Sequence, residues 1–191
     1  GNAALTGNIS GNRNIGIGSS ALTANTSGLD NTAVGHLTLD ANTTGDNNTA
    51  FGSGALSANT TANDNTAIGL NAMNASTEGA GNVAVGYAAL DADTKGSKSV
   101  AIGYQALSAQ NFTTATDVFT VAVGYQAGAV VSTGKSNTFI GAETGKANST
   151  GENNTFIGHE AGEANTTASN NTAVGRDALT NNTTGEVNSA F

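Results

Sequence analysis

The chain has 191 residues, of which 10% are charged, with a net charge of −8, no cysteine and no proline. Leu, Ile, Val and Phe make up about 18% of the chain, below the roughly 20% at which a disordered chain has to be considered. The lack of cysteine excludes disulfides, thiol catalysis and Cys-ligated zinc, and six scattered Lys and Arg residues predict no binding to nucleic acid or anionic lipid. No apolar run approaches the ~18 residues of a membrane span, so no membrane insertion is expected. Two classes remain, a disordered polar tract and a fibrous repeat.

A 17-residue repeat favours the fibre. The string NTAVG and its variants recur along the chain, and the final glycines are 17 residues apart except between Gly103 and Gly124, where the spacing is 21. Counted from these glycines, the chain divides into eleven copies without remainder. A repeat array needs atypical polar caps at its ends, and neither end has one. We therefore expect a single array over residues 1–191 that is a segment of a longer fibre.

Each copy predicts one coil of a solenoid. Numbered from its glycine, the consensus is G-x-x-A-L-x-A-N-T-T-G-x-x-N-T-A-V; in the 21-residue copy, positions 13 to 17 are counted back from Gly124. Glycines at positions 1 and 11 predict two backbone corners that need positive φ or close approach. The segments between them are rich in Thr, Val and Ile and too short for helices. The fold class predicted is all-β, a parallel β-solenoid or β-roll about 53 Å long at ~4.8 Å per coil.

The main strand of each coil is expected at positions 15 to 17, where the residues are β-branched or apolar. In chain order these segments are 15–17, 32–34, 49–51, 66–68, 83–85, 100–102, 121–123, 138–140, 155–157, 172–174 and 189–191.

Two positions exchange large and small residues. Position 5 is Leu in most copies but glycine in three successive ones, Gly128, Gly145 and Gly162, whereas position 16 changes from Ala to Phe139 and Phe156 between those glycines. Conserved volume is expected where two positions share one packed space. We predict that positions 5 and 16 meet inside the coil, beside the small residues of position 7.

Positions 15 and 17 lie on the other face of the same strand and are also apolar or β-branched, as in Val83 with Val85 and Val100 with Ile102. A strand that is apolar on both faces is usually covered on both. The coil itself covers only one face. The pattern therefore predicts a homo-oligomer with this strand turned toward the symmetry axis.

The segments Asn82 to Gly86 (NVAVG), Ser99 to Gly103 (SVAIG) and Val121 to Gly124 (VAVG), with the NTAVG and NTAIG copies, resemble the head repeats of YadA-like trimeric autotransporter adhesins. Related repeats occur in phage tail fibres. The resemblance covers the whole chain as a periodic pattern, and it implies a left-handed, homotrimeric, extracellular β-roll on a cell or virion that binds a host receptor or glycan. Those heads use shorter repeats of about 14 residues, whereas here an N-T-T-G connection, as in Asn42 to Gly45, lengthens each copy.

Asparagine recurs at position 14 in nine copies and at position 8 in seven. Stacked in register, such amides hydrogen-bond along the rod. Sequons such as those at Asn25 and Asn59 offer glycosylation as an alternative. Structural ladders are favoured, because asparagine at fixed positions is typical of solenoid corners.

Aromatic residues supply one candidate ligand or partner surface. All three tyrosines of the chain occur at position 2 of consecutive copies: Tyr87, Tyr104 and Tyr125. Such a stripe is suited to a sugar or a receptor, but stacking of the rings on one another is the favoured interpretation.

The insertion over 108–119 is the other candidate surface. Insertions in a solenoid bulge outward, and this one carries Phe112 and Phe119 in a loop otherwise rich in Thr. We expect the loop either to bind a ligand or to pack against a partner chain.

The titratable residues predict no catalytic, cofactor or metal site. His36 and His159 both occupy position 2, but seven coils or about 34 Å apart, and neither is accompanied by the acid and nucleophile of a triad. Glu143, Glu160 and Asp177 occupy position 3 of successive copies and predict a solvated carboxylate stripe, with an adventitious divalent-cation site as the alternative. The chain is therefore not expected to be an enzyme.

The leading functional hypothesis is a structural and adhesive fibre module, a rigid trimeric β-roll of a cell-surface adhesin, with a phage tail-fibre shaft as the alternative. Ice binding is an alternative of another class, because position 15 is often Thr, although Val83, Val100 and Val121 interrupt that array. An acyltransferase of the left-handed β-helix type is disfavoured, because its coils contain three six-residue units and 17 is not a multiple of six.

Overall fold

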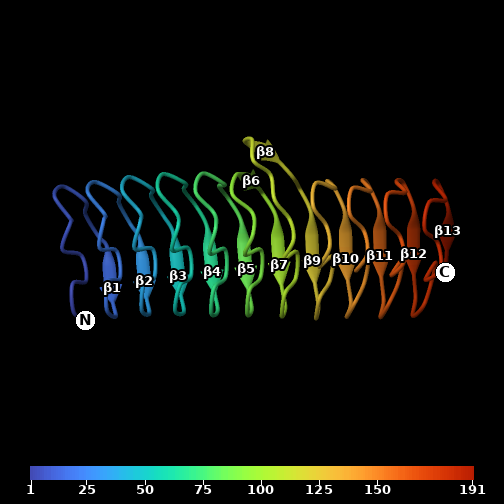
Figure 1. The fold of residues 1–191 in the computed structure, drawn as a ribbon, viewed down its shortest axis with the longest axis horizontal. Helices are drawn as coiled ribbons and strands as arrows, with labels where there is room; N and C mark the ends of the chain where they lie inside the picture. Colours follow the sequence, from blue (N-terminus) through green and yellow to red (C-terminus); the bar gives the residue numbers. More distant parts are fainter.

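A computed structural model describes all 191 residues as a rod of stacked coils, with the two chain ends at opposite ends of the rod (Figure 1). The secondary structure consists of strands alone, and one sheet of eleven strands in sequence order runs along the rod. Its strands are β1 (Ile15–Ile17), β2 (Thr32–Val34), β3 (Thr49–Phe51), β4 (Thr66–Ile68), β5 (Val83–Val85), β7 (Val100–Ile102), β9 (Val121–Val123), β10 (Thr138–Ile140), β11 (Thr155–Ile157), β12 (Thr172–Val174) and β13 (Ser189–Ala190). The predicted fold class, an all-β parallel solenoid, is confirmed.

The repeat period sets the register of the sheet. All neighbouring strands are parallel, and each residue pairs with the residue at the same repeat position of the next coil, as in Thr32 with Thr49 and, across the insertion, Val100 with Val121. Thr32 N donates to Asn48 O at 2.8 Å, and Gly35 N donates to Ile17 O at 2.8 Å. Each position of the repeat therefore forms its own column along the rod. No helix in the structure has the length and hydropathy to cross a membrane.

The exchange of Leu and Phe reflects one shared interior. Position 16 is buried in nearly every coil, and both Phe139 and Phe156 are fully buried. A Cβ atom added to Gly145 would lie 2.6 Å from Phe139 Cε1, and one added to Gly128 would lie 2.9 Å from Phe139 Cδ2. The phenylalanine rings thus occupy space that position 5 fills in other coils. The prediction that positions 5 and 16 meet inside the coil is confirmed.

The prediction for position 7 is wrong. Ala24 and Ala41, which occupy it, are only partly buried, whereas position 4 is fully buried, as at Ala21 and Ala55. Positions 4 and 5 both face inward because φ is positive at position 5 but not at position 4. That change breaks the simple alternation on which the prediction for position 7 depended.

Position 5 has a left-handed backbone in every coil. Leu22 and Leu56 have φ of 51°, and Gly162 has φ of 60°. A residue with a Cβ pays roughly 1–2 kcal/mol for this conformation, whereas glycine does not. The three glycines therefore relax the backbone at the same positions where they vacate volume for phenylalanine.

Glycine is favoured at the two predicted corners for different physical reasons. Position 1 combines positive φ with close approach: Gly35 has φ of 144°, and an added Cβ would lie 2.6 Å from Gly52 O of the next coil. Position 11 shows close approach alone. An added Cβ on Gly134 would lie 2.5 Å from Gly151 O, but its φ is not positive. Position 1 is therefore glycine in every copy, whereas position 11 accommodates a buried methyl group in two coils, at Ala62 and Ala168.

Buried asparagine ladders connect the coils, as predicted. Asn48 is fully buried; its amide nitrogen donates to Ala62 O at 2.8 Å, and its amide oxygen accepts from Asn65 N at 3.1 Å. At position 8, Asn42 Nδ2 donates to Asn25 Oδ1 at 2.9 Å. The sequon residues Asn25 and Asn59 are also fully buried. Their amides lie inside the rod, where a glycan has no room.

Candidate functional site

The tyrosine column is a continuous stack. The ring centroids of Tyr87 and Tyr104 are 5.0 Å apart, and those of Tyr104 and Tyr125 are 5.5 Å apart, with interplanar angles of 17° and 15°. All three side chains remain exposed. Mutual stacking, the interpretation favoured from the sequence, is confirmed. Because the inner ring faces cover one another, a ligand reaches mainly ring edges, hydroxyl groups and the two outer faces.

The insertion builds a small second sheet on the rod. Its strands are β6 (Gly96–Ser97) and β8 (Thr116–Asp117), which pair in parallel, and β8 stands out from the line of coils in Figure 1. Phe112 is only 8% exposed, whereas Phe119 is 55% exposed. Phe112 therefore anchors the loop, and Phe119 is the one of the two phenylalanines that a partner can reach.

Phe119 lies beside two charged residues. Lys98 Nζ is 5.2 Å from the centroid of the Phe119 ring and 2.6 Å from Asp117 Oδ2. A cation over an aromatic face is attracted by the ring quadrupole. The exposed surface of the insertion thus includes an aromatic ring flanked by an ion pair.

A buried carboxylate holds the base of the insertion. Asp93 is nearly fully buried; its Oδ1 accepts hydrogen bonds from the N–H groups of Gly96 at 3.0 Å and Phe112 at 2.9 Å. Its Oδ2 accepts from Gln110 Nε2 at 2.6 Å, and the same nitrogen lies 3.2 Å from Ser99 Oγ. These side chains stand at positions 8 and 14, where other coils have asparagine.

The acidic stripe at position 3 is divided into ion pairs. Glu143 accepts a 2.9 Å hydrogen bond from Lys146, which raises the pKa of the Lys146 ammonium above its ordinary value. Glu160 Oε1 lies 3.5 Å from His159 Nδ1, and Asp177 Oδ2 lies 3.3 Å from Arg176 Nε. The expectation that His159 lacks a nearby acid is wrong, because the next residue along the chain supplies one.

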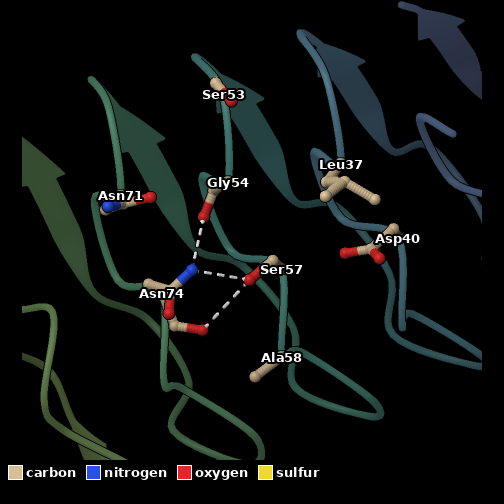
Figure 2. A pocket seen from close by; sticks show the side chains of 8 residues that line it. All are labelled: Leu37, Asp40, Ser53, Gly54, Ser57, Ala58, Asn71 and Asn74. Atoms are coloured by element: carbon tan, nitrogen blue, oxygen red, sulfur yellow. Dashed lines mark hydrogen bonds between the residues drawn. The ribbon is translucent and has the colours of Figure 1, made fainter. Parts of the chain in front are cut away.

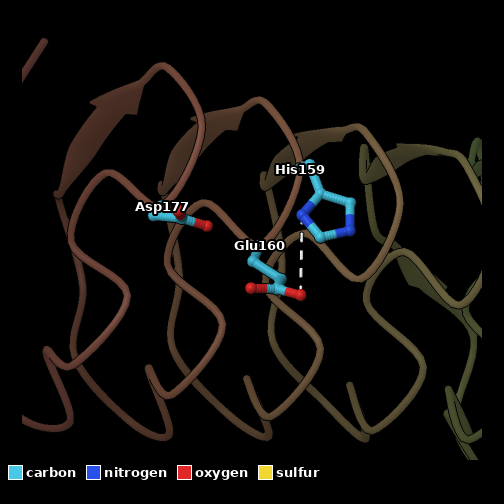
Figure 3. A group of neighbouring side chains, drawn as sticks. All are labelled: His159, Glu160 and Asp177. Carbon is cyan, nitrogen blue, oxygen red and sulfur yellow. Dashed lines mark ion pairs between the residues drawn. The ribbon is translucent and has the colours of Figure 1, made fainter.

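His159, Glu160 and Asp177 bring one ligand atom each to within 4.8 Å of one another (Figure 3). The three side chains are on the outside of two neighbouring coils, and Arg176 already neutralises Asp177. His36 belongs to another coil far along the rod. The group is therefore a surface cluster in which Asp177 is paired with Arg176 and Glu160 lies beside the His159 imidazole.

The outer face of the eleven-stranded sheet is partly exposed and largely apolar: position 17 is apolar in every copy, and position 15 is apolar in four copies and Thr or Ser in the other seven. Seven of its large side chains are between 37% and 57% exposed: Ile15, Ile17, Phe51, Ile68, Ile102, Ile140 and Val174. None of the residues at these two positions in any copy is charged. Contiguous apolar surface of this kind marks an interaction site in soluble proteins.

A pocket of about 300 Å³ opens on another side of the rod, where the coils of β2, β3 and β4 meet (Figure 2). Asp40, Ser57 and Asn74, all at position 6 of successive coils, lie along it, and Gly54 and Asn71 of position 3 form its other edge. Burial raises the pKa of the Asp40 carboxyl above its ordinary value.

The sequence contained signals for two features that the predictions missed. Asp93 and Gln110 depart from asparagine at position 8, and Gly54 is the single glycine at position 3. Both are exceptions to a column. The hydrogen-bond network at Asp93 and the pocket at Gly54 depend on side chains of the neighbouring coils. The sequence therefore shows that these positions are exceptional but does not show what they form.

Comparisons with protein-family models, with curated proteins and with solved structures found no match to this chain.

Proposed function

We propose that the chain is a structural and adhesive fibre module in which three copies associate through the outer face of the eleven-stranded sheet. The observation that carries the proposal is the outward face at positions 15 and 17, which is uncharged in every copy and apolar at position 17 throughout, and which runs along the whole eleven-stranded sheet. Burial of apolar surface stabilises association by roughly 25 cal/mol per Å². A face this long and regular buries the most apolar surface when its partner is equally long.

A second copy of the same chain matches this face best. Its coils have the same spacing, so the residues of positions 15 and 17 meet their own equivalents coil by coil. Isologous or cyclic contacts of this kind are the usual basis of homo-oligomers. The resemblance to YadA-like head repeats favours three chains around one axis.

The rod suits a mechanical role. The chain has 118 backbone hydrogen bonds, most of them between successive coils, and its main sheet is interrupted nowhere along its length. An extended rod of this kind holds a binding surface away from the body that carries it. Cell-surface adhesins and phage tail-fibre shafts both use such a rod, and immunogold labelling of cells and of virions distinguishes the two.

The oligomeric state tests the proposal. Light scattering with size exclusion should give three times the mass of one chain. Ile68→Asp with Ile102→Asp should shift the assembly toward monomer, because it places charge on the apolar face. Leu70→Asp is the matched control: Leu70 is 48% exposed but occupies position 2, and this variant should remain trimeric.

A cysteine probe covers the case in which the double variant does not fold. The chain has no cysteine, so Val85→Cys introduces a single thiol on the proposed interface. Oxidation should link chains through Val85→Cys but not through Leu70→Cys. A wild-type chain that is a folded monomer at micromolar concentration would overturn the trimer.

Ice binding is a second candidate, because the sheet places threonines in register on its outward side. These residues are Thr32, Thr49, Thr66, Thr138, Thr155 and Thr172. Ice binding requires the face to be free of other chains. A monomer that shows thermal hysteresis would support this candidate, and a trimer without hysteresis would eliminate it.

A further inference from the structure

The pocket beside Asp40 exists because one side chain is missing from a column. Every other coil has a side chain at position 3, and Gly54 has none. In the neighbouring coils the column is occupied by Leu37 and Asn71 (Figure 2). The resulting hollow of about 300 Å³ is at the small end of the roughly 300–1,000 Å³ range of small-molecule sites.

Asp40 gives the pocket an acceptor that the protein does not satisfy. Its Oδ1 atom is buried and has no hydrogen-bond partner within the chain. Buried polar atoms nearly always have a partner. A rotation of the Asp40 side chain that turns this atom toward the pocket would let a ligand donate a hydrogen bond to it, and the carboxylate has a second oxygen that accepts from a neighbouring donor.

The amides on the other side of the pocket are partly fixed and partly free. Asn74 Nδ2 donates to Gly54 O at 3.1 Å and to Ser57 Oγ at 2.7 Å, so the orientation of its amide is set and its oxygen remains available. The Asn71 side chain makes no hydrogen bond within the chain and leans over Gly54, where an added Cβ would lie 2.6 Å from Asn71 Oδ1. Leu37, 38% exposed, supplies an apolar edge.

This combination suits a ligand with several hydroxyl groups and no charge. A divalent cation such as Ca²⁺ takes six to eight oxygen ligands, and the pocket has only one carboxylate. Neighbouring hydroxyls of a sugar can donate to the two carboxylate oxygens, amides can both donate and accept, and an aliphatic side chain covers a ring C–H face. These are the groups that the pocket presents.

We propose that the pocket binds one neutral hexose residue, presented by a glycan on the surface to which the fibre attaches. Asp40 accepts two of its hydroxyl hydrogens, Asn71 and Asn74 contact other hydroxyls, and Leu37 packs on the ring. The inference rests on the proposed function in one respect, since positions 3 and 6 must face away from the interface between chains.

The same rod contains a second position 6 aspartate, Asp91, that has no pocket beside it. Asp91 also occupies position 6, burial also raises the pKa of its carboxyl, and it is followed in the next coil by Ser108 as Asp40 is followed by Ser57. The surroundings of the two carboxyls differ at position 3, where Ala88, Gln105 and Gln126 stand in place of Leu37, Gly54 and Asn71, and at position 6 one coil further on, where Ala129 stands in place of Asn74. Gln105 has φ of 53° and Gly54 has φ of 68°, so Gly54→Gln takes a left-handed backbone that other residues at position 3 already adopt, and its Cβ would displace the Asn71 side chain.

The experiment measures binding of glucose, galactose, mannose and N-acetylglucosamine, each alone, by saturation-transfer NMR with the full chain. At least one should bind with a millimolar dissociation constant. Asp40→Asn should weaken it about tenfold, Gly54→Gln should abolish it by filling the pocket, and Asp91→Asn should leave it unchanged. Circular dichroism should show that all three variants keep the fold.

The outcomes separate this inference from the trimer. Failure of all four sugars to bind, or equal binding by the Gly54→Gln variant, would overturn the pocket. Binding of Ca²⁺, added as CaCl₂, in place of sugar would overturn the proposal that the pocket binds a neutral hexose. A trimer that binds no sugar contradicts only the pocket, and a monomer that binds sugar contradicts only the proposed assembly.

Discussion

At the scale of single residues, the buried asparagines of positions 8 and 14 hold neighbouring coils together by hydrogen bonds, in an interior that contains few large apolar side chains. At position 8, Asn42 donates to Gly45 O of its own coil and to Asn25 of the preceding coil, and at position 14, Asn48 bonds to Ala62 and Asn65 of the following coil. Asn25 and Asn42, both fully buried, are linked in this way. A polar group in such an interior is stabilising only when every partner is present.

Asn48→Ala is expected to destabilise the chain by about 2–4 kcal/mol, because it leaves Ala62 O and Asn65 N buried without their partners. Guanidinium denaturation followed by circular dichroism measures the loss. Thr44→Ala, at an exposed position of the same coil, should change stability by less than about 0.5 kcal/mol. Equal effects of the two substitutions would contradict a structural role for the ladder.

At the scale of the coil, position 5 combines two opposing effects. Leu56 fills the interior, but its φ of 51° is unfavourable for a residue with a side chain. Glycine removes that strain and also removes the apolar contact. Phe139 and Phe156 restore the contact from the opposite wall, with ring centroids 5.6 Å apart.

A double-mutant cycle tests this exchange. Phe139→Ala should cost about 3–5 kcal/mol through the cavity that it leaves. Gly145→Leu alone should also destabilise, because the new side chain would overlap the Phe139 ring. Combined, the two substitutions should be less destabilising than the sum of the single effects, since Leu then fills the space of the ring.

Chemical denaturation of the four proteins in the cycle measures the coupling. Additive effects would show that Phe139 and Gly145 do not share a space. A loss of stability near zero for Phe139→Ala would show that the phenylalanines of position 16 do not replace the leucines of position 5 in the core.

At the scale of the whole molecule, the stability of the rod comes from the stacking of each coil on a neighbouring coil of the same shape. Stability in such an array is approximately a sum over coils and their interfaces. The sheet accommodates the insertion without a break, because β7 and β9 pair in the same register as the other strands. The extra residues of this loop thus leave the register of the sheet unchanged.

Deletion of residues 69–85 removes one whole repeat and should leave a folded rod with one cooperative thermal transition. Deletion of residues 69–84 leaves one extra residue beside β4 and should lower the melting temperature further, because a one-residue slip reverses the inward and outward faces of a strand. Circular dichroism during heating compares the two. A 16-residue deletion as stable as the 17-residue one would contradict the coil register.

Much of this architecture could be predicted from the sequence because it is periodic. The spacing of the glycines determined which residues stack, and the change from Leu to glycine with Ala to Phe determined that Phe139 and Gly145 share the interior. Periodicity carries this information because every coil repeats the same neighbours. The asparagine ladders followed for the same reason.

Only the tertiary structure decided what is built where the period is broken. Phe112 and Phe119 belong to one insertion, yet Phe112 is buried against the Asp93 network and Phe119 is exposed. Gly54 could be recognised as an exception at position 3, but the pocket depends on Asp40 and Asn71 in the coils on either side. A repeat fixes what lies above and below a residue; the left-handed backbone at positions 3 and 5 and the shape of a loop fix what lies beside it.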